Sequence, residues 1–332
     1  MSQLVIKRTG PPADVVEFHS RERPVPGPGE VLIRMQAAAI NPADLNFIEG
    51  TYGIKPDLPC VPGMEGAGVI EALGEGVADI FPYLAPGTPV MPGRSPGNWS
   101  AWRVLAASEV LPLPAGTDLQ QAALLRINPA TAWGLLHAAG LPAPGSWVAQ
   151  NAASSAAGHC VIQVAKSLGL KTLNFVRRPE SIPVCGDLGA DLVFLDDAAG
   201  LAAAKTALAA AGAPAPSLAL NAVGGDSALR LLDLLGVNGS HVTYGAMARQ
   251  ALKVPNGLLI FKTLVLRGFW LTRWQDSLPP GDLTHIYQSL AGLAASGQLR
   301  QQIAAAYPIE EFRQALTHAA ASARNGKVLL TF

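Results

Sequence analysis

Cysteine and charge are both scarce in this chain of 332 residues. Its three cysteines, Cys60, Cys160 and Cys185, are too few and too scattered for a disulfide framework or a four-thiolate zinc site. Only 14% of the residues are charged, and the 24 basic and 24 acidic side chains cancel. A neutral balance argues against a nucleic-acid partner, which usually requires a basic face. The 49% hydrophobic content excludes a disordered chain.

The sequence also lacks a segment that is typical of membrane or export proteins. The uncharged stretch between Lys205 and Asp226 contains Pro214 and Pro216 and would make a poor spanning helix. Residues 1–10 lack the basic and apolar regions of a signal peptide. We therefore expect a cytoplasmic protein with no membrane contact.

Turns and short apolar runs alternate along the chain. The first hundred residues contain turn signals such as Pro26–Gly29, and they predict an irregular β-rich domain. Between Trp147 and Tyr244, short apolar strands alternate with helical segments. This alternation predicts a parallel sheet that is covered by helices on both faces.

These patterns predict an α/β protein with two domains, as the length also suggests. A doubly wound Rossmann domain is expected over 118–263. The later segments, a helix over 281–299 and a final strand, do not continue the repeat. We expect residues 264–332 to return to the β-rich domain that residues 1–117 begin.

A small-residue turn follows the first strand of the predicted Rossmann domain and opens a helix. Small side chains let a pyrophosphate approach the helix N-terminus, where free N–H groups favour an anion. The usual glycine-rich fingerprint is reduced here to its last glycine, and an ordinary capped helix remains the alternative. The predicted phosphate-binding residues are Ser154, Ser155, Ala156, Ala157 and Gly158.

Two arginines follow the second strand, which ends at Val176. NAD-dependent proteins carry an acidic residue in this region, whereas an arginine there accommodates the 2′-phosphate of NADP. Arg177 and Arg178 can form charge-assisted contacts to a phosphate, so NADPH is favoured over NADH. A solvated surface pair is the alternative interpretation.

A series of short motifs resembles one known family. The motifs are Asn41–Asn46 with Gly50–Tyr52, Val61–Gly66, Asn128–Ala132, Gln150–Ala152, Asn221–Gly225, Tyr244–Met247, Gly268–Trp274 and Gly326–Leu330. Together and in this order they resemble the medium-chain dehydrogenase/reductase superfamily, specifically its zinc-free 2-enoyl thioester reductases. The resemblance implies a Rossmann domain beside a GroES-like catalytic domain.

The resemblance also implies chemistry without a metal. Zinc-dependent members carry a cysteine and a histidine ligand where this chain has Asn41 and Met64, which are poor zinc ligands. Reduction of an activated C=C bond fits instead, with a proton donor for the enolate that forms. By resemblance, Tyr52 is that donor and Trp270 approaches the substrate. A surface tyrosine and a core or interface tryptophan are the alternatives.

The remaining cofactor residues are implied by the resemblance alone. Asn128 and Thr131 match positions near the nicotinamide ribose, and Lys327 matches a C-terminal cofactor contact, although a solvated lysine is its alternative. Asp44 and Glu65 are interpreted as a buried charge pair or loop caps. Further expected contacts are Tyr244, Gly245, Ala246, Met247, Phe269, Trp270 and Leu271.

Three functions stay open at this stage. The first is NADPH-dependent reduction of a trans-2-enoyl thioester, and the second is reduction of a quinone or small enone. The third is an NADPH-binding protein without turnover. No basic cluster marks a dock for coenzyme A or a carrier protein, and the acyl length is open. The apolar strand expected over 264–269, together with the family, predicts a homodimer.

Overall fold

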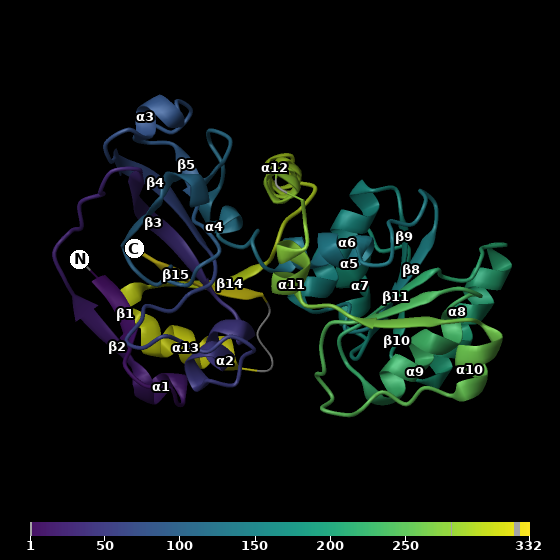
Figure 1. The fold of residues 1–332 in the computed structure, drawn as a ribbon. Coiled ribbons are helices and arrows are strands. Elements are labelled where there is room, and N and C mark those ends of the chain that lie inside the picture. The colour runs from purple at the N-terminus through teal and green to yellow at the C-terminus, as the bar shows by residue number, and fades with distance from the viewer. Residues whose placement is uncertain (1, 280, 322–325) are drawn as a thin grey trace. The chain divides into compact units, whose positions relative to one another are not determined.

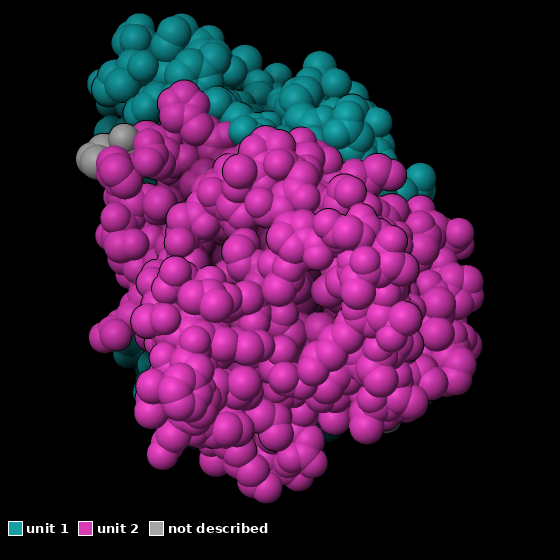
Figure 2. Space-filling model, turned by 90° about the vertical axis from the view of Figure 1, so that its right-hand side faces the viewer, with its two compact units in different colours: residues 1–127, 287–332 teal, residues 128–286 magenta. Residues whose placement is uncertain are grey.

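The computed structural model describes residues 2–279, 281–321 and 326–332, and it divides into two compact units (Figures 1 and 2). Unit 1 comprises Met1–Ile127 and Tyr287–Phe332, and unit 2 comprises Asn128–Ile286. The sequence-based boundaries were 117/118 and 263/264. They differ because α4 (Leu119–Ala122) contacts the sheet of unit 1, and β13 (Val265–Gly268) pairs within the sheet of unit 2.

Unit 2 is built on a six-stranded sheet in which all neighbouring strands run parallel. The strand order is β10-β9-β8-β11-β12-β13. The order reverses between β8 and β11, and such a switch point is where open α/β sheets bind ligands. The predicted doubly wound domain is confirmed. The strands are β8 (Trp147–Gln150), β9 (Lys171–Val176), β10 (Leu192–Leu195), β11 (Leu218–Asn221), β12 (Ser240–Thr243) and β13.

The helices of unit 2 follow the predicted alternation with the strands. A buried apolar cluster that includes Phe175, Leu231 and Leu232 packs the helices against the sheet. Pro183 lies in the first turn of α7, where a residue needs no intrahelical N–H bond. The helices are α5 (Asn128–His137), α6 (Ala156–Ser167), α7 (Ser181–Asp187), α8 (Ala198–Ala210), α9 (Gly225–Leu234), α10 (Asn256–Phe261), α11 (Leu271–Asp276) and the first part of α12 (Asp282–Ala295).

Unit 1 contains a mostly antiparallel sheet that includes the end of the chain. Its strand order is β14-β15-β3-β4-β5-β7, with β6 on β3, and β1 and β2 form a separate pair. Of the segment 264–332 that was expected to return to this domain, residues 287–332 lie in unit 1, where β15 pairs with both β14 and β3, and residues 264–286 lie in unit 2. The strands are β1 (Ser2–Ile6), β2 (Val16–Ser20), β3 (Glu30–Ile40), β4 (Gly66–Leu73), β5 (Pro89–Met91), β6 (Trp102–Ala106), β7 (Leu111–Pro112), β14 (Ile303–Pro308) and β15 (Lys327–Thr331).

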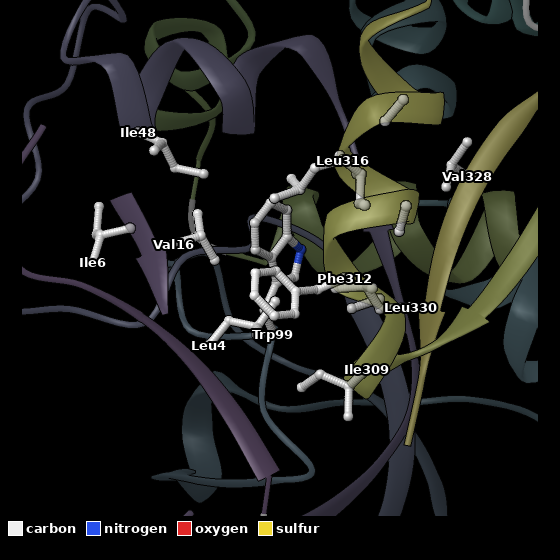
Figure 3. Close-up of a cluster of buried hydrophobic side chains, with 14 of the residues drawn as sticks. Leu4, Ile6, Val16, Ile48, Trp99, Ile309, Phe312, Leu316, Val328 and Leu330 are labelled. Carbon is white, nitrogen blue, oxygen red and sulfur yellow. The ribbon is translucent and has the colours of Figure 1, made fainter. Parts of the chain in front are cut away.

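The core of unit 1 gathers side chains from both ends of the chain (Figure 3). Trp99 is fully buried against Phe312 and Leu316 of α13 (Phe312–Ala320), and its indole N–H donates to the carbonyl of Ala39 at 3.0 Å. A buried indole usually needs such a partner. The other helices of this unit are α1 (Pro12–Val15), α2 (Pro42–Glu49) and α3 (Val77–Ile80), with short 3-10 turns at Ala107–Glu109 and Ile309–Glu311.

In the described part of the chain, every helix is too short or too polar to cross a bilayer.

Candidate functional site

The N-terminus of α6 lies at the switch point, directly after β8. Ser155 caps this helix, and its hydroxyl oxygen accepts the N–H of Gly158 at 3.1 Å. Helix geometry leaves the first N–H groups without intrahelical acceptors, so the first turn presents donors to an anion. Ser154 is exposed, and Ala156 and Ala157 are partly exposed, which leaves this turn open. The turn therefore fits a phosphate group.

Gly158 brings α6 unusually close to the turn before it. A Cβ atom at this position would lie 2.6 Å from the carbonyl oxygen of Ala153 and 2.7 Å from that of Ala152. Real Cβ contacts are not this short, and backbone atoms cannot move aside as a flexible side chain can. The one glycine left in the sequence motif is therefore a steric requirement of the turn before α6.

Arg177 and Arg178 are both exposed at the carboxyl end of β9. The guanidinium of Arg178 lies 3.6 Å from the carboxylate of Glu180, and both side chains are largely in water. Such an exposed pair contributes little to stability, so it costs little to exchange for a phosphate. The position after the second strand fits the 2′-phosphate of NADP.

A buried amide network joins the carboxyl ends of the central strands. Asn151, after β8, donates to the side chains of Asn221 and Ser227, at 2.8 Å each, and accepts the N–H of Ala222 at 2.7 Å. The hydroxyl of Ser227 donates to Asp196 at 2.5 Å. This network holds the loops after three parallel strands in fixed register. No role was assigned to this network from the sequence. The feature that could have revealed it is an asparagine at the end of each of two apolar strands.

The segment from Tyr244 to Met247 follows β12 and is fixed by the loop after β11. Tyr244 and Met247 donate backbone N–H bonds to Asn221 and Ala222. The Tyr244 hydroxyl is buried with no hydrogen-bond partner in the described residues, and burial raises the pKa of this phenol. The Tyr244 hydroxyl is therefore covered, whereas the Met247 side chain is 65% exposed. Gly245 and Ala246 lie between them at the same sheet edge.

Phe269, Trp270 and Leu271 connect β13 to α11. The Phe269 ring lies against α5, where a Cβ at Gly134 would come within 2.6 Å of it, and it also contacts Trp274 with ring centroids 5.9 Å apart. Phe269 therefore has a packing role within unit 2. Trp270 is 37% exposed and precedes the first residue of α11, Leu271. Its exposure is compatible with a ligand contact.

Asn128 and Thr131 both lie in the first turn of α5 and are partly exposed. Their spacing places them on the same face of the helix. The helix therefore brings Asn128 and Thr131 close together, and two residues that contact the same nicotinamide ribose must lie close together.

Tyr52 lies in the turn that ends α2. Gly50 ends the helix with φ of 73°, and the N–H groups of Thr51 and Tyr52 both donate to the carbonyl of Asn46, at 2.8 and 3.1 Å. The half-buried Tyr52 ring packs against the core of unit 1. The turn thus holds the tyrosine in a defined position relative to α2.

Lys327 lies buried among polar side chains of unit 1. Its side chain is 4% exposed, and its ammonium donates to the Asn41 amide oxygen and lies 3.8 Å from Glu65. Of the two interpretations of Asp44 and Glu65, a buried charge pair or loop caps, the structure favours the second, because both buried carboxylates accept N–H groups of neighbouring segments. Asp44 accepts the N–H groups of Asn41 and Met64, each at 2.8 Å.

Burial dominates the electrostatics of these two carboxyl groups. Asp44 has no solvent exposure, and burial raises its pKa from 3.8 to about 7, against the lowering effect of its two N–H donors. Burial also raises the pKa of Glu65, and the nearby Lys327 ammonium opposes that shift. Asn41 and Met64, the two residues that the sequence comparison set against zinc ligands, both donate hydrogen bonds to these carboxyl groups. In the described residues, no group of three or more His, Cys, Asp or Glu side chains could hold a metal ion.

Two family models match most of the chain. The alcohol dehydrogenase GroES-like domain matches residues 27–115, and the zinc-binding dehydrogenase model matches residues 156–284. The mitochondrial enoyl-[acyl-carrier-protein] reductase of Mus musculus is 38% identical over 99% of this chain and 88% of its own length. The corresponding Homo sapiens protein is 37% identical with the same coverage.

Solved structures of similar proteins cover the whole chain. One is the Etr1p/Etr2p heterodimer, a mitochondrial 2-enoyl thioester reductase of Candida tropicalis, with 25% identity, a TM-score of 0.87 and 99% of that chain covered. A mutant of Etr1p in complex with NADP and crotonyl-CoA has 26% identity, a TM-score of 0.86 and the same coverage. A protein of Bacillus thuringiensis assigned as an NADPH:quinone reductase has 26% identity, a TM-score of 0.87 and 98% coverage.

The cytoplasmic location expected from the sequence is contradicted by these relatives, because the similar curated reductases are mitochondrial. The expectation rested on the lack of a membrane segment and of a signal peptide in the sequence. Neither property separates a cytoplasmic enzyme from one that works inside an organelle.

Proposed function

Because this chain belongs to the medium-chain dehydrogenase/reductase family and is an oxidoreductase of its enoyl thioester reductase type, we propose that it uses NADPH to reduce the C=C bond of a trans-2-enoyl thioester. The observation that carries this proposal is the similarity to enoyl reductases over 99% of the chain. The substrate-side tyrosine turn and the phosphate turn both lie within that similarity.

Unit 2 supplies the proposed cofactor site. The first turn of α6, with Ser154 and Ser155, would hold the pyrophosphate, and Arg177 and Arg178 would hold the 2′-phosphate. Asn128, Thr131 and the segment Tyr244–Met247 would contact the nicotinamide half. When bound, NADPH supplies the hydride. The chain's own contribution is to orient the cofactor by fixed backbone groups, which the Asn151–Asn221 network keeps in place.

Tyr52 is the proposed proton donor to the α-carbon. A phenol stays protonated at neutral pH and can donate a proton or a hydrogen bond as enolate charge develops. The turn after α2 fixes its backbone through Asn46, so its position does not depend on a mobile loop. Trp270, at the start of α11, is the proposed aromatic contact for the substrate.

Reduction of a quinone or a small enone is the second candidate. It is favoured by the similarity to the Bacillus thuringiensis protein, which is as close in structure as the thioester reductases. The two functions share the cofactor and the fold, and they differ in whether Tyr52 transfers a proton or only binds the substrate. An NADPH-binding protein without turnover is the third possibility, and the same assay tests it.

The deciding experiment is NADPH oxidation by the purified protein with crotonyl-coenzyme A and with a simple quinone, side by side. We expect faster turnover with the thioester and a large loss of kcat in Tyr52→Phe, with NADPH affinity unchanged. Tyr83→Phe is the matched control, because Tyr83 is 59% exposed in the same unit. Turnover with the quinone alone would assign the second function, and NADPH binding with neither activity would assign the third.

We also propose that the chain forms a homodimer through β13. This strand is the edge of the parallel sheet, and exposed apolar side chains lie on it and before it: Val265 is 42% and Phe261 is 82% exposed. An exposed apolar edge is a site for pairing with another strand. Analytical ultracentrifugation should show a dimer, and Val265→Lys should shift it toward monomer; a monomeric wild-type protein would contradict the proposal.

A further inference from the structure

One fully buried carboxylate in unit 1, Glu65, has partners from three separate segments of the chain. Its Oε1 atom accepts the side-chain amide N–H of Asn41 at 2.9 Å, and its Oε2 atom accepts the backbone N–H of Ile127 at 2.9 Å. The ammonium of Lys327 lies 3.8 Å from Oε1. Burying a carboxylate costs several kcal/mol unless it is paired and hydrogen-bonded, so every partner here matters.

The Oε1 atom of Glu65 is linked through Asn41 to the helix whose last turn holds the proposed proton donor. Asn41 is the N-cap of α2, and the turn at the other end of this helix holds Tyr52. A hydrogen-bonded helix of eight residues is a stiff link, so the position of its N-cap also sets the position of its C-terminal turn. Asp44 ties the same N-cap to Met64, the residue before Glu65.

The Oε2 atom of Glu65 is linked through Ile127 to the proposed nicotinamide contact, Asn128. Ile127 directly precedes Asn128, the first residue of α5. The residue before it, Arg126, is also fixed, because its guanidinium donates to the carbonyl of Pro92 at 2.7 Å and its own carbonyl accepts the Tyr287 hydroxyl at 3.1 Å. The chain therefore enters α5 from an anchored point, and Glu65 holds the last backbone N–H before it.

We propose that Glu65 is a positioning residue for the reaction, which holds the Tyr52 turn through Asn41 with one carboxylate oxygen and the Asn128 end of α5 through Ile127 with the other. This inference rests on the proposed function, since it assigns Glu65 to the residues of that same site. The role needs two acceptor oxygens at once. A carboxylate provides them, whereas an amide of the same shape provides only one. Lys327 balances the charge.

Glu65→Gln is the direct test because it keeps the shape and removes one acceptor. The new NH₂ group must face either Asn41 or Ile127, so one anchor is lost. A shift of roughly 1 Å in a reacting group can cost about 100-fold in rate. We therefore expect kcat to fall by about that factor, with a smaller change in KM. Glu71→Gln is the matched control, because Glu71 pairs with Arg23 and Arg34 at the surface of the same unit.

Hydrogen exchange gives a readout that does not depend on the substrate. In Glu65→Gln, we expect faster amide exchange in the peptides that cover 41–54 or 126–131 and unchanged exchange elsewhere in unit 1. Exchange equal to the wild type in both peptides would overturn the positioning role. If the wild-type protein reduces no activated alkene, the proposed function fails, and this measurement still decides whether Glu65 anchors the two segments.

A double variant separates positioning from simple charge balance. Lys327→Met with Glu65→Gln replaces the buried ion pair by neutral groups and should recover most of the thermal stability that either single change loses. Its kcat should stay as low as in Glu65→Gln, because only one acceptor is present. Recovery of kcat together with stability would show that Glu65 has only a structural role and would overturn the inference.

Discussion

Replacing Gly158 by alanine should damage cofactor binding more than its single added methyl group suggests. The new Cβ would lie 2.6 and 2.7 Å from two carbonyl oxygens of the preceding turn, and 2.7 Å from the Cα of Ala153. Since these are backbone atoms, α6 must move away from the turn. Overpacking of this kind costs about 1–3 kcal/mol of stability.

The same movement displaces the N–H groups that would hold the pyrophosphate. A hydrogen bond to a charged group contributes about 1.5–3 kcal/mol, and each 1.4 kcal/mol is about tenfold in affinity. Loss of one such bond predicts NADPH binding that is about 10- to 100-fold weaker. Titration of NADPH fluorescence measures this, and thermal unfolding measures the stability loss.

Gly186→Ala is the matched control, because Gly186 lies within α7 of the same unit and a Cβ there meets no atom within 4 Å. Alanine should be neutral or stabilising at that position, since glycine costs about 0.5–1 kcal/mol in a helix. Wild-type NADPH affinity in Gly158→Ala would refute the assignment of the turn before α6 to the cofactor phosphates.

Two further predictions concern charge. The double change Arg177→Ala with Arg178→Ala should weaken NADPH far more than NADH, because only NADPH carries the 2′-phosphate; equal losses in parallel titrations would reject that role. Burial raises the pKa of Asp44 above its value in the unfolded chain, so the native state binds its proton more tightly. Stability should therefore fall as pH rises from 3.8 to about 7, by up to about 4 kcal/mol at 1.4 kcal/mol per unit. Asp44→Asn should flatten this slope in denaturant titrations at several pH values, and an unchanged slope would assign the pH dependence to another group.

The strand–helix alternation of unit 2 could be predicted from sequence because most of its strands are short, mainly apolar runs, and such runs are visible without knowledge of distant contacts. The domain boundaries could not, because α4 and β13 are assigned by what they pack against. Gly158 was visible as a motif residue, although its steric role needed the carbonyls of Ala152 and Ala153 in space.

The buried charges of unit 1 show the other limit of sequence reasoning. Lys327 was interpreted as a cofactor contact or a solvated lysine, since nothing next to it in sequence reveals a pairing with Asn41 and Glu65. Burial of a lysine is set by partners that are hundreds of residues away. The hydrogen bond from Ile127 to Glu65 could not be predicted either, because a backbone N–H makes it and the type of side chain does not indicate it.

The strand order of unit 1 has a consequence for synthesis of the protein on the ribosome. Unit 2 is one uninterrupted stretch, so all of its strand pairs can form once the chain up to Ile286 has left the ribosome. By contrast, β3 is synthesised early, and its pairing partner β15 is formed by the last residues of the chain. The part translated first is thus completed last, and a nascent chain exposes the β15 side of β3 until translation ends. Molecules released early would carry a finished nucleotide-binding unit and an open sheet edge, which is a target for aggregation or quality control.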